Sequence, residues 1–332
     1  MVNTIYSFLK IYIGDILASR KIQLVAGSTY SVSLPKEWVR RNGLKEGKEI
    51  HFNENGDGSL SFFLSEFNKN RPSKLSFDID QYTDGIDQLL FATYYSGISE
   101  ILLDSKNGIS KDDRKAIHNT ITKMSGTEIK YEDSNKVEIK CFLDESKVNI
   151  KQILYRICLI LEMTIQSTTD NSTLAQASKS EEEIDRLYHL AVKIITLSLL
   201  DSKILNSSGI KNSVLIPAYF LIFKKLENIG DSTLLLTERI IKEGKLTKEE
   251  TADIILLAKE IKRCASFIQS DKQTLFERFP SQKEKDLLTR PRAIAGNWIQ
   301  QNIENIARAI NDVEEELLSI SIYTQFMQDK IL

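Results

Sequence analysis

The sequence predicts an α+β multidomain protein, and three observations support this fold class. Its 332 residues are enough for two or three domains with full-sized cores. Glycine becomes sparse after residue 126, which favours a mixed first half and a helical second half. Short alternating apolar stretches precede that point, and long stretches with apolar residues at three- and four-residue steps follow it. We therefore expect a small β-barrel, then a small α/β layer, then an antiparallel helical bundle.

The composition excludes several classes of protein. Hydrophobic residues make up 42% and charged residues 27%, as in ordinary soluble globular proteins, and the net charge is only −2. The cysteines Cys141, Cys158 and Cys264 have neither zinc-site spacing nor a disulfide pattern, so we expect buried, reduced thiols in a cytoplasmic protein. No apolar stretch reaches the roughly 18–20 residues that span a bilayer, so we expect no membrane insertion.

Residues 1–19 are interpreted as an N-terminal extension, such as one that begins at an upstream start codon. Their apolar part, residues 5–18, contains Lys10 and Asp15. It lacks the basic leader and the small-residue cleavage site of a signal peptide. A peripheral membrane helix is the alternative interpretation.

Residues 20–66 are expected to form the first domain. Alternating apolar residues between Ile22 and Leu34 predict two short strands. Pro35 suits the first turn of a short helix, and Gly43 suits its end. A unit of this size cannot close a core alone, so it should need a partner chain. Two further strands are expected at 49–52 and 59–64, with a turn at 53–58.

Residues 28–50, STYSVSLPKEWVRRNGLKEGKEI, closely resemble the SpoVT/AbrB (MazE-like) DNA-binding family. The resemblance implies a swapped-hairpin barrel in which two chains interleave, and therefore a homodimer that binds DNA. Residues 20–50 contain seven Lys and Arg against three Glu, and this local positive charge suits phosphate contacts. A pure dimerisation module is the alternative. The family's DNA-contacting regions are matched here by Arg20, Lys21, Lys36, Arg40 and Arg41.

Residues 74–147 are expected to form a small α/β layer after a linker at 70–73. The apolar patterns predict the order β-α-β-α-β-β. The segment contains no glycine-rich phosphate loop, no nucleophile elbow and no metal-ligand spacing. His118 falls in a predicted helix, where a surface or packing role is expected.

Residues 148–328 are expected to form an antiparallel bundle of long helices joined by short loops. The stripe from Ile222 to Ile240 recurs at three- and four-residue steps and should face the core. Gly244 and Thr247 are helix stop and start signals, and 206–212 is expected to be a loop. The helices are expected at about 148–169, 177–203, 213–243, 247–276 and 288–325.

Two acidic pairs on predicted helices are the candidate metal ligands. Glu181 and Asp185, and likewise Glu227 and Asp231, are four residues apart and therefore share a helix face. Like charges at this spacing cost a few tenths of a kcal/mol unless solvent or a cation offsets them. Both pairs lie beside the apolar stripes, at the edge of a groove. Carboxylates alone favour hard ions such as Mg, Ca, Mn or Fe over Zn. By spacing alone, solvated surface charge is the alternative.

The segments LENIGD (226–231) and EEEID (181–185) resemble the PhoU family of phosphate-signalling regulators. The resemblance implies a bundle in which such pairs face each other and hold a divalent or trivalent metal ion. His189, one turn after Asp185, offers a nitrogen ligand. A second cluster is expected to be lost or altered, because Glu304 is followed four residues later by Arg308.

Together the two resemblances imply a protein similar to archaeal PhoU-domain proteins with an N-terminal AbrB domain. We expect a regulator of phosphate uptake and homeostasis, not an enzyme, acting through transcription or through a phosphate transporter or its sensor. The first alternative is an adaptor in which the barrel only dimerises the chain. A remote alternative is a di-metal carboxylate oxidase, whose bundle helices carry Glu-x-x-His. That motif is absent, because the residues three before His51, His118 and His189 are Lys48, Lys115 and Arg186.

Overall fold

The computed structural model describes residues 19–54, 59–63, 73–82, 85–169, 173–244, 246–270, 274–289 and 297–326. The chain divides into an N-terminal unit, residues 1–52 and 62–65, and a larger unit formed by residues 53–61 and 66–332. Several expected features lie outside the described residues. They are the extension at 1–18, most of the turn at 53–58, the linker at 70–72 and the start of the last predicted helix at 290–296.

The N-terminal unit, taken from here on as the described residues between 19 and 63, consists of two short hairpins and one helix. Strand β1 (Gln23–Val25) pairs antiparallel with β2 (Thr29–Ser31). The turn between them places Ala26 and Gly27 at φ values of 50° and 72°, a conformation in which glycine is unstrained. Helix α2 (Lys36–Arg41) follows Pro35, and β3 (His51–Glu54) pairs with β4 (Leu60–Phe63).

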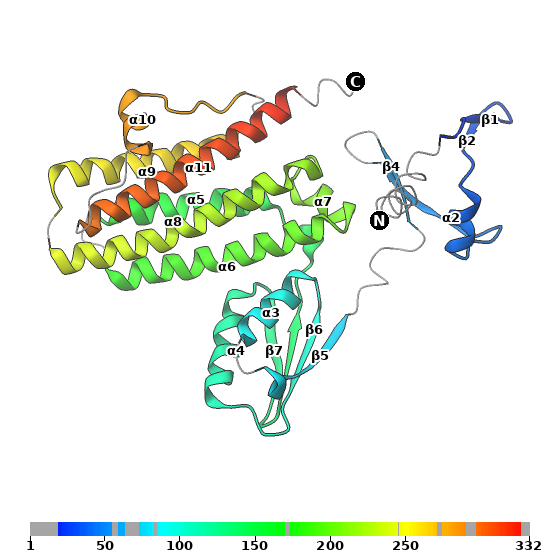
Figure 1. Cartoon of the computed structure of the whole chain (residues 1–332), viewed down its shortest axis with the longest axis horizontal. Helices are drawn as coiled ribbons and strands as arrows, with labels where there is room; N and C mark the ends of the chain where they lie inside the picture. The colour runs from blue at the N-terminus through cyan, green and yellow to red at the C-terminus, as the bar shows by residue number, and fades with distance from the viewer. Residues whose placement is uncertain are drawn as a thin grey trace, which may run out of the picture. The chain divides into compact units, whose positions relative to one another are not determined.

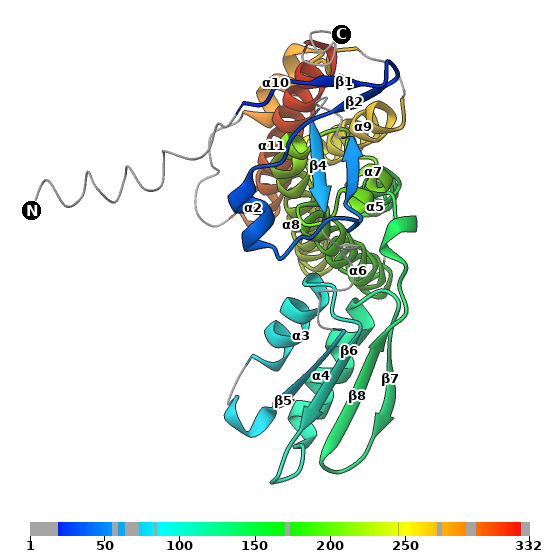
Figure 2. The same ribbon diagram turned by 90° about the vertical axis from the view of Figure 1, so that its right-hand side faces the viewer.

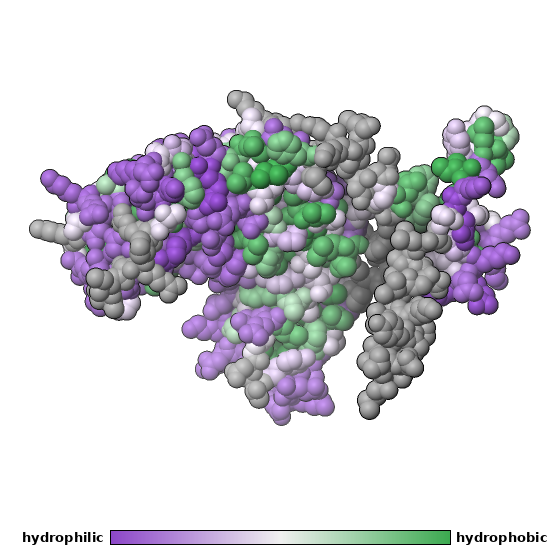
Figure 3. All heavy atoms as spheres, turned by 45° about the horizontal axis from the view of Figure 1, so that its top comes forward, coloured by the Kyte–Doolittle hydropathy of each residue, from purple (hydrophilic) through white to green (hydrophobic). Residues whose placement is uncertain are grey.

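The N-terminal unit has no core of its own in the part that the structure describes. No residue there with an assigned burial between 19 and 63 is buried. Hydrophobic side chains instead lie at its surface (Figure 3), and these include Ile22, Leu24, Val25, Tyr30, Val32, Phe52, Leu60 and Phe62, which are 41–75% exposed. Burying such side chains is the main favourable term in folding, so this unit requires a partner surface.

The α/β layer contains one four-stranded sheet and two helices (Figures 1 and 2). Strands β5 and β6 are parallel, and β8 pairs antiparallel with both β6 and β7, in the order β5-β6-β8-β7. The elements follow the β-α-β-α-β-β order that the sequence predicts. They are β5 (Lys74–Asp78), α3 (Ile86–Tyr95), β6 (Glu100–Asp104), α4 (Lys111–Lys123), β7 (Thr127–Glu132) and β8 (Lys136–Cys141).

Alternation along the strands explains which face of the sheet is covered. Every second residue of β6 and β8 is buried, as expected for a sheet with one packed face. Leu103, Val137 and Ile139 from that face form one core with Leu90 of α3 and Ile117 of α4. The helices α3 and α4 thus cover one face, and both also contact α6 of the bundle.

The C-terminal region is helical. Capping boxes at Thr173 and Thr247 begin two of its long helices, and Gly244 in the left-handed conformation ends another. The closest neighbours are α8 with α11, α5 with α9, and α6 with α8. The helices are α5 (Ile150–Ser167), α6 (Leu174–Ser198), α7 (Ser202–Ser208), α8 (Ile216–Glu243), α9 (Lys248–Gln269), α10 (Gln282–Leu288) and α11 (Trp298–Phe326).

The helix boundaries differ from the predicted ones at several points. The helix expected at 177–203 ends at Ser198, and Asp201 caps a separate α7 by accepting from the Lys203 backbone N–H at 2.9 Å. Helix α7 takes up residues 206–208 of the expected loop. Helix α9 ends at Gln269 rather than 276, and α10 was not predicted.

The described chain is therefore mostly helical, with a small antiparallel sheet near its N-terminus and a helical C-terminal region. The assignment of that region to a PhoU-like bundle remains a prediction. Among the described helices, none is both long and apolar enough to cross a membrane.

Candidate metal centre and nucleic-acid interface

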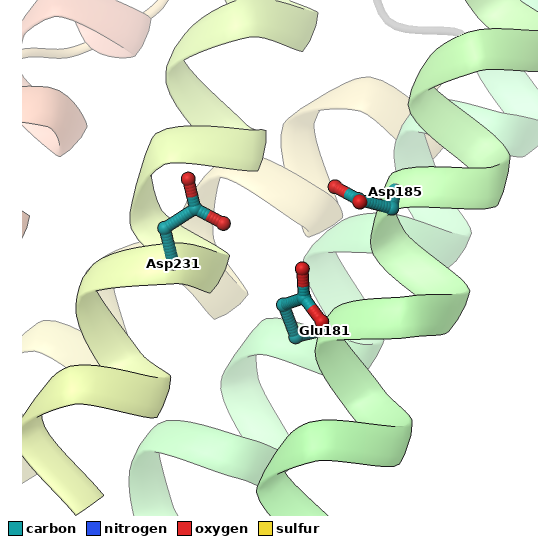
Figure 4. A group of neighbouring side chains, drawn as sticks. All are labelled: Glu181, Asp185 and Asp231. Atoms are coloured by element: carbon teal, nitrogen blue, oxygen red, sulfur yellow. The ribbon is translucent and has the colours of Figure 1, made fainter. Parts of the chain in front are cut away.

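Three of the four predicted metal ligands converge between α6 and α8. Glu181 and Asp185 lie one turn apart on α6, and Asp231 points toward them from α8 (Figure 4). Each offers a carboxylate oxygen, and these oxygens lie within 4.8 Å of one another. Ions bound at about 2.0–2.6 Å from each oxygen allow ligand separations up to about 5 Å. This group of three residues, here called the acidic cluster, therefore fits a hard cation.

A glycine allows the two helices to approach each other beside the acidic cluster. A Cβ atom added at Gly230 would lie 3.3 Å from Cδ1 and 3.4 Å from Cγ2 of Ile184. The first of these contacts is tighter than ordinary van der Waals separation, so a Cβ at position 230 would require the Ile184 side chain to shift by a few tenths of an ångström. Ile184 and Gly230 directly precede Asp185 and Asp231, so this close approach of the two helices lies beside the carboxylates.

Glu227 does not join the acidic cluster. Its Oε2 accepts from Nζ of Lys224 at 2.7 Å, one turn earlier on the same helix. Burial raises the pKa of Glu227, and the bond to Lys224 opposes that rise. The sequence predicts four converging carboxylates, and the structure brings three of them together. The fourth, Glu227, is bound by Lys224 instead.

The electrostatics of the acidic cluster resemble those of a site that lacks enough counter-charge. Burial raises the pKa values of Glu181 and Asp231, and the charge of Asp185 adds to both shifts. Converging carboxylates repel one another, and removing their hydration is costly unless a positive charge is near. A bound di- or trivalent ion would supply that charge, and the ligand set of oxygens suits Mg, Ca, Mn or Fe.

One cation near the acidic cluster could not be predicted from the sequence. Lys123, at the end of α4, donates from Nζ to Oδ2 of Asp185 at 2.5 Å. Burial lowers the pKa of Lys123, but its bond to Asp185 and the charges of Glu181 and Asp231 raise the pKa above its ordinary value overall. The two bonded residues are 62 positions apart, and no local pattern signals that α4 packs on α6.

His189 lies one turn beyond Asp185, but it is held by the α/β layer. Its Nδ1 is 2.5 Å from the Tyr95 hydroxyl, and its ring stacks on Phe91 with centroids 3.8 Å apart. Burial lowers the pKa of His189 to about 4, so the imidazole is neutral at physiological pH. A neutral imidazole can serve as a metal ligand, but His189 is not among the three residues whose ligand atoms converge.

Glu304 and Arg308 of α11 lie near each other, and the expected loss or alteration of a second cluster there stays a prediction. Nη1 of Arg308 lies 3.8 Å from Oε2 of Glu304, which is 3% exposed.

The five predicted DNA-contacting residues are all exposed in the N-terminal unit. Arg40 and Arg41 lie in the last turn of α2, and Lys36 begins that helix. Lys36 and Arg40 are four residues apart and therefore share a helix face. Glu37 lies 4.0 Å from Arg40, but both side chains are more than 80% exposed, so this pair leaves Arg40 available. The remaining two, Arg20 and Lys21, are exposed just before β1.

Comparison with known proteins identifies one segment. The family model for "Antidote-toxin recognition MazE, bacterial antitoxin" matches residues 23–60. No curated protein and no solved structure matches the chain. The match supports the SpoVT/AbrB-like identity of the N-terminal unit and indicates a region of the DNA-binding or antitoxin type. It does not extend to the helical region, so the PhoU resemblance rests on LENIGD and EEEID alone.

Proposed function

We propose that this protein is a dimeric, DNA-binding regulator whose helical region binds a metal ion. The observation that carries the proposal is the MazE-like segment at 23–60, which combines exposed apolar strands with an exposed basic helix end. The apolar strands suit a second copy of the chain, because interleaving two copies would give each its missing core. The basic residues suit the phosphate backbone of DNA.

The metal-binding part of the proposal rests on the acidic cluster. Glu181, Asp185 and Asp231 would hold the ion, and its charge would offset their mutual repulsion. We further propose that the regulator controls phosphate uptake. This proposal rests on the resemblance of LENIGD and EEEID to PhoU proteins. In this account the helical region is the sensory part and the N-terminal dimer is the output.

The adaptor is the second candidate function, because the exposed apolar strands would serve dimerisation even without DNA. In that case the helical region would act on a phosphate transporter or its sensor.

A gel shift distinguishes the two functions. The DNA is taken from the region upstream of the gene that encodes this protein. The full chain should retard this DNA, and a chain that lacks residues 1–66 should not. Retardation by neither chain, with the full chain still dimeric in sedimentation, would favour the adaptor.

A further inference from the structure

Lys123 reaches from the α/β layer into the acidic cluster of the bundle. Its Nζ is 2.5 Å from Oδ2 of Asp185, and its charge also acts on Glu181 and Asp231. Because the ligand oxygens of the three carboxylates lie within 4.8 Å of one another, the ammonium bonded to Asp185 lies beside the whole acidic cluster. The side chain of Asp185 is 12% exposed and that of Lys123 is 39% exposed, so the ion pair is buried at its carboxylate end and reached by solvent at its ammonium end.

The chain just after Lys123 is held against the bundle through Ser125, and α3 is held one turn beyond Asp185. Nη1 of Arg186 on α6 donates to the Ser125 hydroxyl at 3.4 Å, and the Tyr94 hydroxyl of α3 donates to the Ser125 carbonyl at 3.0 Å. The pair Tyr95–His189 joins α3 to α6 one turn beyond Asp185. Lys123 is thus presented to the acidic cluster by a docked layer, not by a free side chain on a loop.

We propose that Lys123 is the residue that sets the metal affinity of the acidic cluster, because its ammonium competes with the ion for the same carboxylates. The inference rests on the metal site proposed above. An ammonium and a divalent ion that share three carboxylates lie within a few ångströms of each other and repel strongly. Entry of the ion therefore displaces Lys123 and loosens the last turn of α4 from α6.

Competition between Lys123 and the ion also suggests a role for the α/β layer, in whose sequence we find no catalytic motif. The layer would respond to metal binding through α4. Docking of α4 favours the metal-free state, and metal binding favours release of its last turn. The two equilibria are then linked, and each shifts the other by the same factor. Metal binding to the acidic cluster would thereby change the packing of the α/β layer. In the sequence, this layer lies between the N-terminal unit and the helical region.

The test is Mn²⁺ binding to the full chain, measured by isothermal titration calorimetry. Lys123→Met should bind Mn²⁺ at least about tenfold more tightly than the wild type, because it removes a positive charge a few ångströms from the ion. Lys123→Arg keeps the charge and should bind as weakly as the wild type. The matched control is Lys115→Met, an exposed residue two turns earlier on α4, which should leave the affinity unchanged.

Hydrogen exchange supplies a readout independent of affinity. Mn²⁺ should speed amide exchange at 120–124 in the wild type and in Lys115→Met, but not in Lys123→Met. Equal Mn²⁺ affinities in the wild type and Lys123→Met would overturn the inference and leave the metal site standing. Binding to Lys123→Met alone would support it in its strongest form, in which the ammonium excludes the ion. Absence of binding to every variant would refute the metal site itself, and the inference with it.

Discussion

A pair of buried glutamates between α9 and α11 leads us to expect that the stability of the bundle depends on pH. Glu260 and Glu314 are both fully buried, and the Arg263 guanidinium contacts both, at 2.7 Å from Oε2 of Glu260. The two carboxyls also lie within hydrogen-bonding reach of each other. Oε1 of Glu260 and Oε2 of Glu314 have no donor in the described part of the chain. A proton shared between the carboxyls would complete this arrangement.

The size and sign of the effect follow from the pKa of Glu314. Burial raises this pKa from 4.5 to about 7, while Arg263 opposes the rise and Glu260 adds to it. The folded state therefore holds the proton more tightly than the unfolded state. The resulting stabilisation is complete below about pH 4.5 and is lost as the pH rises to about 7. At about 1.4 kcal/mol per pH unit between these values, the loss is about 3 kcal/mol.

Glu314→Gln tests this reasoning, because the amide keeps the shape of the side chain and cannot ionise. Trp298 at the start of α11 reports unfolding of this helix by its fluorescence, provided that Trp38 is first replaced by Phe. Urea unfolding from pH 4.5 to 8 should show that the wild type loses about 3 kcal/mol relative to Glu314→Gln. Glu238→Gln, at an exposed position of α8, gives the baseline for an amide substitution.

Parallel pH profiles for the wild type and Glu314→Gln would refute the reasoning. They would mean that Arg263 alone balances both carboxylates and that no proton is held between them. A loss of stability in Glu314→Gln that is equal at every pH would also refute the shared proton, since it would reflect packing alone.

Three further predictions concern the acidic cluster and the N-terminal unit. Asp231→Ala should lower the bound metal content and abolish most of the metal-dependent rise in melting temperature, which corresponds to about 2.7 kcal/mol at a hundredfold excess of ion over Kd; a melt of the wild type that is indifferent to chelator would contradict this. Gly230→Ala should weaken Mn²⁺ binding severalfold because the added methyl meets Ile184, while its higher helix propensity, about 1 kcal/mol, limits the loss of stability; unchanged affinity in calorimetry would show that the helices yield. A fragment of residues 20–66 should be dimeric when folded, and a folded monomer in sedimentation equilibrium would disprove the shared core.

The sequence predicted the elements well wherever a local pattern encodes them. Alternation produced the strands of the α/β layer, and capping residues such as Thr247 and Gly244 fixed helix ends. The break after Ser198 was missed because apolar residues continue across it, and Asp201 caps α7 only when the chain has already turned. Helix α10 is too short for its periodicity to be recognised.

The acidic cluster could be predicted only in part. Spacing placed Glu181, Asp185 and Asp231 on helix faces, but it could not show that Lys224 binds Glu227 and leaves it out of the cluster. Lys123 joins them through the packing of α4 on α6, which is a long-range contact. The burial of Glu260 and Glu314 could not be predicted either, because charged residues on a helix usually indicate an exposed face.

The central claim, that the MazE-like unit binds DNA, is tested most directly by the salt dependence of binding. Fluorescence anisotropy would measure the affinity of the full chain for a labelled DNA duplex at several salt concentrations. The duplex is taken from the region upstream of the gene that encodes the protein. We expect the double variant Arg40→Gln/Arg41→Gln to remain dimeric and bind more weakly, with a salt slope reduced by about two units. The charge-matched control, Lys242→Gln/Lys248→Gln in the bundle, should match the wild type. Equal affinity and equal slope in all three proteins would contradict the claim.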